Sequence, residues 1–253
     1  MDRPLILVSN DDGISAPGIR ALIDMVREIG DVVVVAPDGP QSGMGHAITL
    51  NSTLRCDQIH IDDGPQIEYE CSGTPVDCVK LAISTILERK PDLCVSGINH
   101  GSNSSINVIY SGTMSAALES AIEGIPSIGF SLLDYSLDAD FSESAYYIRR
   151  ITKKILANKL DKGTCLNVNI PKKKNGKKIQ GIKLCCQADA SWKEEFQERK
   201  DPTGRTYYWL TGDFVNYDDR KDTDEWALAN HYVSIVPIQF DLTAHHSILN
   251  LKK

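Results

Sequence analysis

The sequence LILVSNDDG at residues 5–13 decides the fold, because an apolar run ends abruptly at two aspartates and a glycine. Such a run is typical of a buried strand that ends at the edge of a sheet. Gly13 permits a sharp turn. Ser15 can then cap a helix whose first turn holds Pro17. Because ligands of α/β proteins bind at the carboxyl ends of parallel strands, the two aspartates lie where a site is expected.

Asp11 and Asp12 are neighbours in sequence, so their carboxylates repel each other. At about 4 Å and an effective dielectric constant near 20, two like unit charges cost roughly 4 kcal/mol. That cost corresponds to about three pKa units. Either one aspartate is protonated at pH 7 or a cation sits between the two. The alternative is a pair of solvated turn residues with no partner.

The composition bounds the class of protein. The chain has 253 residues, 42% of them hydrophobic, and a net charge of -7. An acidic balance argues against binding to a nucleic-acid duplex, which needs a basic stripe. The densest basic run, residues 172–178, surrounds Asn-Gly and is interpreted as a hairpin turn. We expect no membrane span and no signal peptide, since the first strand begins at once and no apolar run is long enough.

The seven cysteines favour a reducing compartment. Their number is odd and none of them forms a CxxC pair. Several lie in apolar runs, where cysteine packs as a small hydrophobic residue. A reduced, cytoplasmic protein fits this pattern better than a disulfide framework does.

Strands and helices alternate through about residue 160. This alternation predicts an α/β fold, a doubly wound, Rossmann-like and mostly parallel sheet over residues 1–160. Residues 161–253 are predicted to form a hairpin-rich C-terminal extension, partly continuing the sheet and partly projecting. The predicted strands are 5–9, 31–36, several within 46–71 around a hairpin at 62–64, 92–99, 126–132, 166–170, 179–187, 206–210 and 232–238. The predicted helices are 19–29 with Gly30 as C-cap, 75–87 with Thr74 as N-cap, 113–123 and 142–159.

Three predicted strand ends supply oxygen ligands. They are Asp11 with Asp12, Ser42, and Asn99. Carboxylate, hydroxyl and amide oxygens suit Mg²⁺ or Mn²⁺. Zinc would recruit His or Cys, and His245-His246 is disfavoured as a ligand pair because adjacent side chains diverge.

A second half of the site is predicted at residues 110–113, Tyr-Ser-Gly-Thr, directly before a helix. Backbone N–H groups at a helix start, two hydroxyls and a glycine form an anion cradle. Asn103 adds an amide donor. The alternative is an ordinary Ser/Thr N-cap after a glycine loop. Beside a cation site the cradle is favoured, because a phosphate then bridges the metal and the helix start.

These motifs together resemble the SurE family, the stationary-phase survival protein E. The resemblance rests on residues 5–13, Ser42-Gly43, SGINHGSN at 96–103, YSGT at 110–113 and PSI at 126–128. It covers most of residues 5–135 in the right order, and the strand near residues 232–237 is also similar. One local departure is Met44-Gly45-His46, which follows Ser42-Gly43.

The resemblance implies a divalent-metal-dependent phosphatase, a 5′/3′-nucleotidase that acts on nucleoside monophosphates. One Mg²⁺ or Mn²⁺ per subunit is implied, and so is a homodimer or homotetramer that packs or exchanges C-terminal segments. The expected reaction is in-line attack of water on the phosphate ester, with Asp11 or Asp12 orienting the water or taking its proton. The implied metal ligands are Asp11, Asp12, Ser42 and Asn99. The implied phosphate-binding residues are Asn103, Ser111, Gly112 and Thr113.

Two other classes of protein compete with this interpretation. A receiver-like regulatory module also begins with an apolar strand that ends in acids around Mg²⁺. Such a module is about half as long as this chain, however, and it needs a phospho-acceptor aspartate, for which Asp38 is a poor candidate. A dinucleotide-binding oxidoreductase lacks support, because the first turn has no GxGxxG and carries two acids. Tyr110, Trp192 and Tyr217 are candidates for base stacking, or else ordinary packing and surface residues. Base and metal preference stay open.

Overall fold

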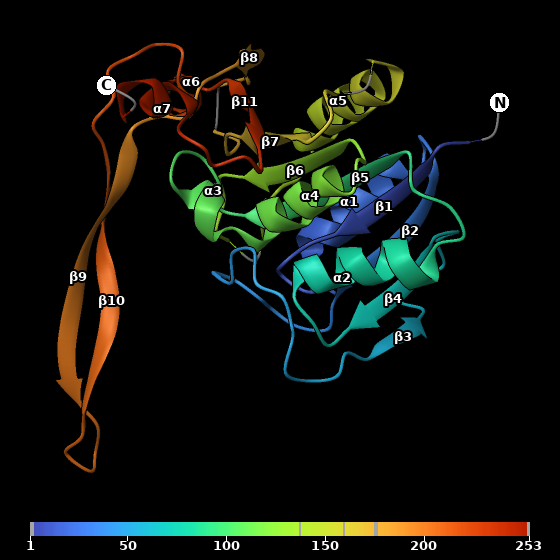
Figure 1. Ribbon diagram of the computed structural model, residues 1–253, viewed down its shortest axis with the longest axis horizontal. Helices are drawn as coiled ribbons and strands as arrows, with labels where there is room; N and C mark the ends of the chain where they lie inside the picture. The colour runs from blue at the N-terminus through green and yellow to red at the C-terminus, as the bar shows by residue number, and fades with distance from the viewer. Residues whose placement is uncertain (1–2, 137, 159, 175–176, 252–253) are drawn as a thin grey trace.

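The computed structural model describes residues 3–136, 138–158, 160–174 and 177–251. Within them one nine-stranded sheet forms the body of the molecule (Figure 1). Its strands, in spatial order, are β3 (Cys56–Ile59), β4 (Ile67–Cys71), β2 (Asp31–Pro37), β1 (Leu5–Ser9), β5 (Leu93–His100), β6 (Ser127–Leu132), β7 (Thr164–Ile170), β11 (Val233–Gln239) and β8 (Ile182–Leu184).

The sheet is mostly parallel, which confirms the predicted doubly wound α/β fold. Strands β4, β2, β1, β5, β6 and β7 run parallel, while β3 pairs antiparallel with β4 and β11 antiparallel with β7. The chain moves outward from β1 to β2 and later returns to place β5 on the other side of β1. The strand order therefore reverses beside β1, and such a switch point is where open α/β sheets bind ligands.

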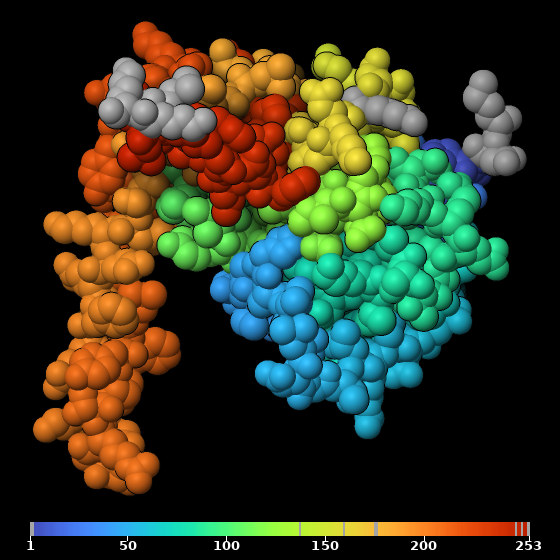
Figure 2. Space-filling model, in the orientation of Figure 1, coloured from blue at the N-terminus to red at the C-terminus, as the bar shows by residue number. Residues whose placement is uncertain are grey.

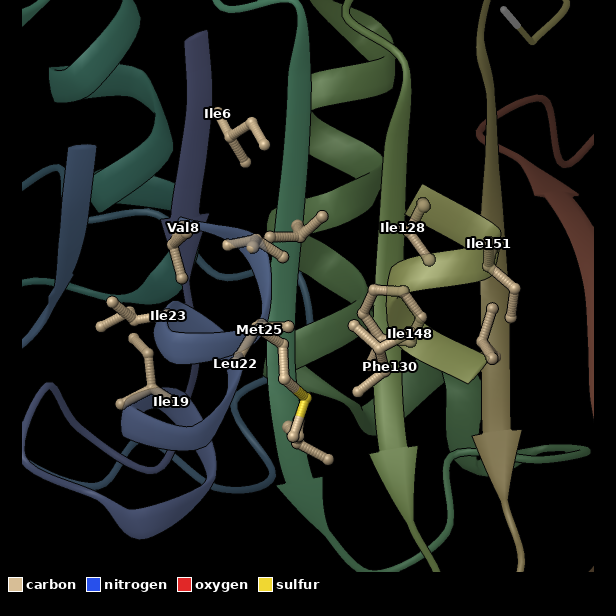
Figure 3. Close-up of a cluster of buried hydrophobic side chains, with 14 of the residues drawn as sticks. Ile6, Val8, Ile19, Leu22, Ile23, Met25, Ile128, Phe130, Ile148 and Ile151 are labelled. Carbon is tan, nitrogen blue, oxygen red and sulfur yellow. The ribbon is translucent and has the colours of Figure 1, made fainter. Parts of the chain in front are cut away.

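Helices cover both faces of the sheet because the strands are apolar on both sides. On one face, α1 (Pro17–Val26) and α5 (Ser144–Asn158) pack against Ile6 and Val8 of β1 and Phe130 of β6 (Figure 3). On the other face, α2 (Pro75–Leu81) and α4 (Gly112–Ile122) pack against Leu7. Successive strand residues point to opposite faces, so one apolar run serves two cores.

The N-cap predicted for α2 is confirmed. The Thr74 hydroxyl accepts the N–H of Asp77 at 3.2 Å, and an Asp77 carboxylate oxygen accepts the N–H of Thr74 at 3.0 Å, with Pro75 in the first turn. This reciprocal pair satisfies two donors that the helix leaves open. Beyond Leu81 the chain continues as a π-helical turn, η1 (Ala82–Ile86).

Three local predictions in the first half were wrong. The N-cap of α1 is Ala16 and not Ser15, and no side chain caps this helix. Helix α1 ends at Val26, with Arg27 as its cap, and not at Gly30. A Cβ on Gly30 would lie 2.3 Å from the Pro4 carbonyl oxygen. Glycine is therefore needed here because the backbone at residue 30 lies against the backbone just before β1. Residues 46–55 do not form a strand. The Thr49 N–H and hydroxyl donate to the Asp77 carboxylate, and the Ala47 carbonyl accepts the Thr74 hydroxyl, so these groups are bound to the cap of α2 and not to a neighbouring strand. The hairpin at 62–64 is present between β3 and β4.

The C-terminal third both extends the sheet and projects from it. Strands β7, β11 and β8 continue the sheet, while β9 (Ala190–Lys200) and β10 (Thr206–Asn216) pair antiparallel as an arm that stands clear of the body (Figures 1 and 2). Strand β9 and the short helices α6 (Asp224–Ala229) and α7 (His245–Leu251) were not predicted. The arm is exposed along most of its length, so it lacks the alternation of apolar and polar residues that marks a half-buried strand.

The basic run at 172–178 forms a bridge between Lys174 and Lys177, as a hairpin would, and its Asn-Gly turn lies outside the described residues. In the described part of the chain, no helix combines the length and hydrophobicity needed to cross a bilayer.

Candidate functional site

The two aspartates that follow β1 lie among polar groups from neighbouring strand ends. The backbone N–H of Gln41, in the loop after β2, donates to the Asp11 carbonyl oxygen at 2.7 Å. The N–H of His100, at the end of β5, approaches Asp12 Oδ2 at 3.4 Å. The loop that carries Ser42 and the strand end that carries Asn99 therefore flank the aspartates, as parallel strand order predicts.

Asp11 is buried, and its carboxylate faces the start of α4. The Thr113 hydroxyl donates to Asp11 Oδ1. Burial raises the pKa of Asp11 to about 6; the bonds from Thr113 lower it and the charge of Asp12 raises it further. A carboxylate in this position is costly to ionise without a cation nearby.

Asp12 is less buried than Asp11 but shows the same tendency. Burial raises its pKa, and the His100 N–H works in the opposite direction. Two adjacent carboxyl groups with raised pKa values form a site that gains stability when a cation neutralises them. The two carboxyl groups therefore lie side by side in surroundings that disfavour two negative charges.

The other two predicted ligands flank this pair. Ser42 lies in the loop at residues 38–55, here called the Ser42 loop, and its side chain is exposed one residue beyond the Gln41–Asp11 bond. Asn99 is half-buried, and its Nδ2 donates to the Gly101 carbonyl at 3.0 Å. Since the nitrogen of the amide is the donor in that bond, Oδ1 is the atom suited to a cation.

Helix α4 begins one residue earlier than predicted, at Gly112, so Ser111 is its N-cap. Ser111 Oγ accepts the N–H of Met114 at 3.0 Å. A Cβ on Gly112 would lie 2.7 Å from Asp11 Cβ and 3.0 Å from Asp11 Oδ2. Only glycine lets the helix start approach Asp11 this closely. The helix start and the aspartates are therefore two sides of one site.

Asn103 is buried in a polar network beneath the loop that follows β5. Its Nδ2 donates to Ser131 Oγ, its N–H donates to Asn169 Oδ1, and its carbonyl accepts Asn167 Nδ2, all within 2.7–2.8 Å. The amide predicted to bind phosphate thus contacts Ser131 in this structure. The supporting residues of β6 and β7 were missed, although Asn-Val-Asn inside an otherwise apolar strand was a signal of polar residues on one face.

An ion cluster around the buried Glu119 joins the Ser42 loop to α4, and the sequence analysis missed it. His46 Nε2 lies 2.8 Å from Glu119 Oε2, and Lys80 Nζ donates to Glu119 Oε1. Burial alone would raise the pKa of Glu119, but the bonds from His46 and Lys80 outweigh it and lower the pKa. A second tie joins Gly45 N to the Tyr110 carbonyl at 3.1 Å. Within Met44-Gly45-His46, the local departure, Gly45 therefore ties the loop to Tyr110 and His46 ties it to α4.

We expect Glu119→Gln to lower the free energy of unfolding by about 1–2 kcal/mol at pH 7, because two charge-assisted hydrogen bonds lose their charged acceptor. Since the pKa of Glu119 is lowered in the folded state, the difference from wild type should shrink as the pH falls through the acid range of glutamate. Urea denaturation at several pH values measures both effects.

Glu123→Gln, at the C-cap of the same helix, is the matched control. Its partner Lys90 lies 3.7 Å away and both side chains are well exposed, so we expect a change below about 0.5 kcal/mol. Equal losses in the two variants would contradict a special role for Glu119.

The remaining candidates lie elsewhere. His245 pairs with Asp241 at 2.7 Å, and the side chain of His246 is outside the described set. Among the described residues no group of three or more His, Cys, Asp and Glu side chains could hold a metal ion. A cation at this edge would thus depend on the two aspartates with Ser42 and Asn99. A cavity of about 1000 Å³ lies at the other end of the strands, beside Pro4 and Pro126, without this convergence of acids and helix start.

Comparisons with known proteins show the family of this chain. The family model described as "Survival protein SurE" matches residues 6–194. The chain is 66% identical over 250 residues to the 5′-nucleotidase SurE of Christiangramia forsetii, covering 98% of this chain and 96% of that protein. It is 64% identical over 248 residues to the 5′-nucleotidase SurE of Flavobacterium psychrophilum, and this match covers 98% of this chain and 96% of that protein.

A solved structure is similar over the whole chain. The SurE protein from Aquifex aeolicus superposes with a TM-score of 0.82 at 40% sequence identity, covering 99% of this chain and 100% of that one. The similarity therefore includes the late strands and the arm as well as the first 135 residues.

Proposed function

Since this chain belongs to the SurE family, we propose that it is a divalent-metal-dependent phosphomonoesterase that hydrolyses nucleoside 5′-monophosphates, and also 3′-monophosphates, to nucleoside and phosphate. The observation that carries the proposal is the contact of Asp11, which has Asp12 beside it, with the start of α4. A buried acid and a helix N-terminus face each other at a strand-order switch point, which supports a cation and a phosphate bound side by side.

In this proposal Asp11, Asp12, Ser42 and Asn99 hold one Mg²⁺ or Mn²⁺. All four supply oxygen, the donor both ions prefer. The raised pKa values of the two aspartates support the proposal, because a nearby positive charge would stabilise both carboxylates. When bound, such a cation lowers the pKa of water and neutralises charge on phosphoryl oxygens.

The chain's own groups have distinct tasks. Thr113 orients Asp11 through its hydroxyl. Asp12, the less buried of the two acids, accepts a proton from the attacking water or aligns it. Among the described residues the N–H of Gly112 has no hydrogen-bond partner, and it lies at the positive end of α4. We propose that it donates to a phosphate oxygen while the ester oxygen leaves on the opposite side, in line with the water.

Phosphate release from nucleoside mono-, di- and triphosphates, with Mg²⁺, Mn²⁺ or a chelator, tests this function. We expect release from monophosphates that needs the metal and stops when the chelator is added. No metal-dependent release from any monophosphate would overturn the proposal. Stable phosphorylation of the chain without release would instead favour the receiver-like alternative, which the match to the SurE family over residues 6–194 disfavours.

We further propose that the protein is cytoplasmic and assembles as a homodimer or homotetramer. The arm supports assembly, because it presents large apolar side chains to solvent, among them Phe196, Trp209 and Leu210, which are 58–68% exposed. Exposed apolar surface of this kind is typical of protein–protein contacts.

A further inference from the structure

A pocket of about 360 Å³ lies between the end of α3 (Asn107–Tyr110) and the root of the arm. Its size falls within the range of small-molecule sites, roughly 300–1,000 Å³. Its lining residues are Tyr110, Trp192, Glu194, Leu210, Thr211 and Gly212. Two segments about 80 residues apart in sequence form it, and Figures 1 and 2 show the root of the arm beside α3.

The pocket is next to the proposed phosphate site. Tyr110 precedes the cap Ser111 and the helix start Gly112, and two residues of chain span at most about 7 Å. The Tyr110 carbonyl also accepts the N–H of Gly45 from the Ser42 loop. One wall of the pocket is thus continuous with the groups proposed to hold the phosphate.

The opposite wall is built into the root of the arm. Trp192 Nε1 donates to Asn107 Oδ1 at 2.8 Å, and its ring meets Phe214 edge to face, with ring centroids 5.5 Å apart. Gly212 has φ +147°, and a Cβ there would lie 2.3 Å from the Lys193 carbonyl, so a side chain would push the two strands of the arm apart. The indole is held in place, yet 44% of Trp192 and 52% of Tyr110 remain exposed.

We propose that this pocket binds the base of the nucleoside monophosphate, stacked on Tyr110 and Trp192, with Glu194 accepting a hydrogen bond from an exocyclic amino group. The inference rests on the proposed function and deepens it. Aromatic rings stack on any base, whereas a carboxylate only accepts hydrogen bonds and so favours a base that donates. Adenine, cytosine and guanine carry such an amino group; uracil and hypoxanthine do not. Tyr217, the third aromatic candidate, does not line the pocket.

The first test compares a substrate that carries a base with one that does not. For adenosine 5′-monophosphate and ribose 5-phosphate, Trp192→Ala should raise the ratio of the two KM values about tenfold, the effect expected for losing one stacking partner. Trp192→Phe keeps a ring and should restore most of the ratio. Tyr217→Ala, an exposed aromatic outside the pocket, should leave it unchanged.

The second test addresses Glu194. Glu194→Gln gives the pocket a donor as well as an acceptor, so the preference in kcat/KM for adenosine over inosine 5′-monophosphate should fall about fivefold. For the first test, equal KM values for adenosine 5′-monophosphate and ribose 5-phosphate in the wild type would overturn the inference. An equal rise of these two KM values in Trp192→Ala would also overturn it.

Binding separates this inference from the proposed function. If no substrate releases phosphate, the proposed function fails, while calorimetric binding of adenosine 5′-monophosphate still reports on the pocket. We expect affinity to fall about tenfold in Trp192→Ala relative to wild type and Tyr217→Ala. Unchanged affinity would contradict the pocket as a base site.

Discussion

Asp11→Asn is expected to lower metal-dependent phosphate release by about 10³-fold or more while leaving the fold intact. Asparagine has nearly the same shape, and its Oδ1 can still accept the Thr113 hydroxyl. What disappears is one negative charge at the proposed cation site, and losing several kcal/mol of charge stabilisation corresponds to three or more powers of ten in rate. Steady-state kinetics with Mn²⁺ or Mg²⁺ measure the loss.

The same substitution should stabilise the protein when no metal is present. Because the pKa of Asp11 is raised from 3.8 to about 6 in the folded state, stability is lost as the pH rises from the lower to the higher of these values. The difference from an ordinary aspartate corresponds to roughly 3 kcal/mol above pH 6. Asparagine does not titrate, so in chelator the variant should unfold at higher urea than wild type at pH 8, with the gap closing toward pH 4.

Asp38→Asn is the matched control for both effects. Asp38 follows β2 as Asp11 follows β1, but it is exposed whereas Asp11 is buried. We expect wild-type activity and wild-type stability from it. Near-normal turnover in Asp11→Asn would refute the metal-site assignment, and a loss of stability in chelator would refute the cost assigned to the buried carboxylate.

Gly112→Ala is expected to reduce activity about 10²-fold through shape alone. The added Cβ would lie 2.7 Å from Asp11 Cβ, so Asp11 or the helix start must move. A displacement of about 1 Å at a reacting site costs on the order of 10²-fold in rate. Alanine is otherwise the better helix former, so circular dichroism should show an unchanged helix content. Kinetics with a nucleoside monophosphate measure the loss.

Gly39→Ala provides the comparison for that steric effect. Gly39 lies in the Ser42 loop near the same edge of the sheet, and a Cβ there meets no atom within 4 Å. Its activity should stay within about twofold of wild type. If both alanine variants behave alike, contact between α4 and Asp11 does not control the reaction.

The order of elements and half of the site were predictable because they depend on local patterns. Buried strands appear as continuous apolar runs, and the cap at Thr74 is a short-range motif. The aspartates and Asn99 follow such runs directly, so parallel topology alone brings them to one edge. The roles of these residues as metal ligands stay predictions that the variants above test.

The anchors of the site were not predictable in the same way. Glu119 lies 73 residues from His46 and 39 from Lys80, and no local pattern joins them. Strand β9 was missed because an arm exposed on both faces has no reason to alternate apolar and polar residues. The pocket between Tyr110 and Trp192 depends on where that arm leaves the body.

The sequence by itself determined the doubly wound sheet, the two acids at its switch point and the SurE family, since periodicity, caps and motif order are properties of neighbouring residues. Only the tertiary structure decided that Gly112 touches Asp11, that Glu119 fastens the Ser42 loop and that the arm's root faces Tyr110. These contacts join residues far apart in the chain. They exist because packing of the helices and the arm on the sheet excludes other arrangements. Such packing cannot be inferred from the order of apolar and polar residues within a short stretch of sequence.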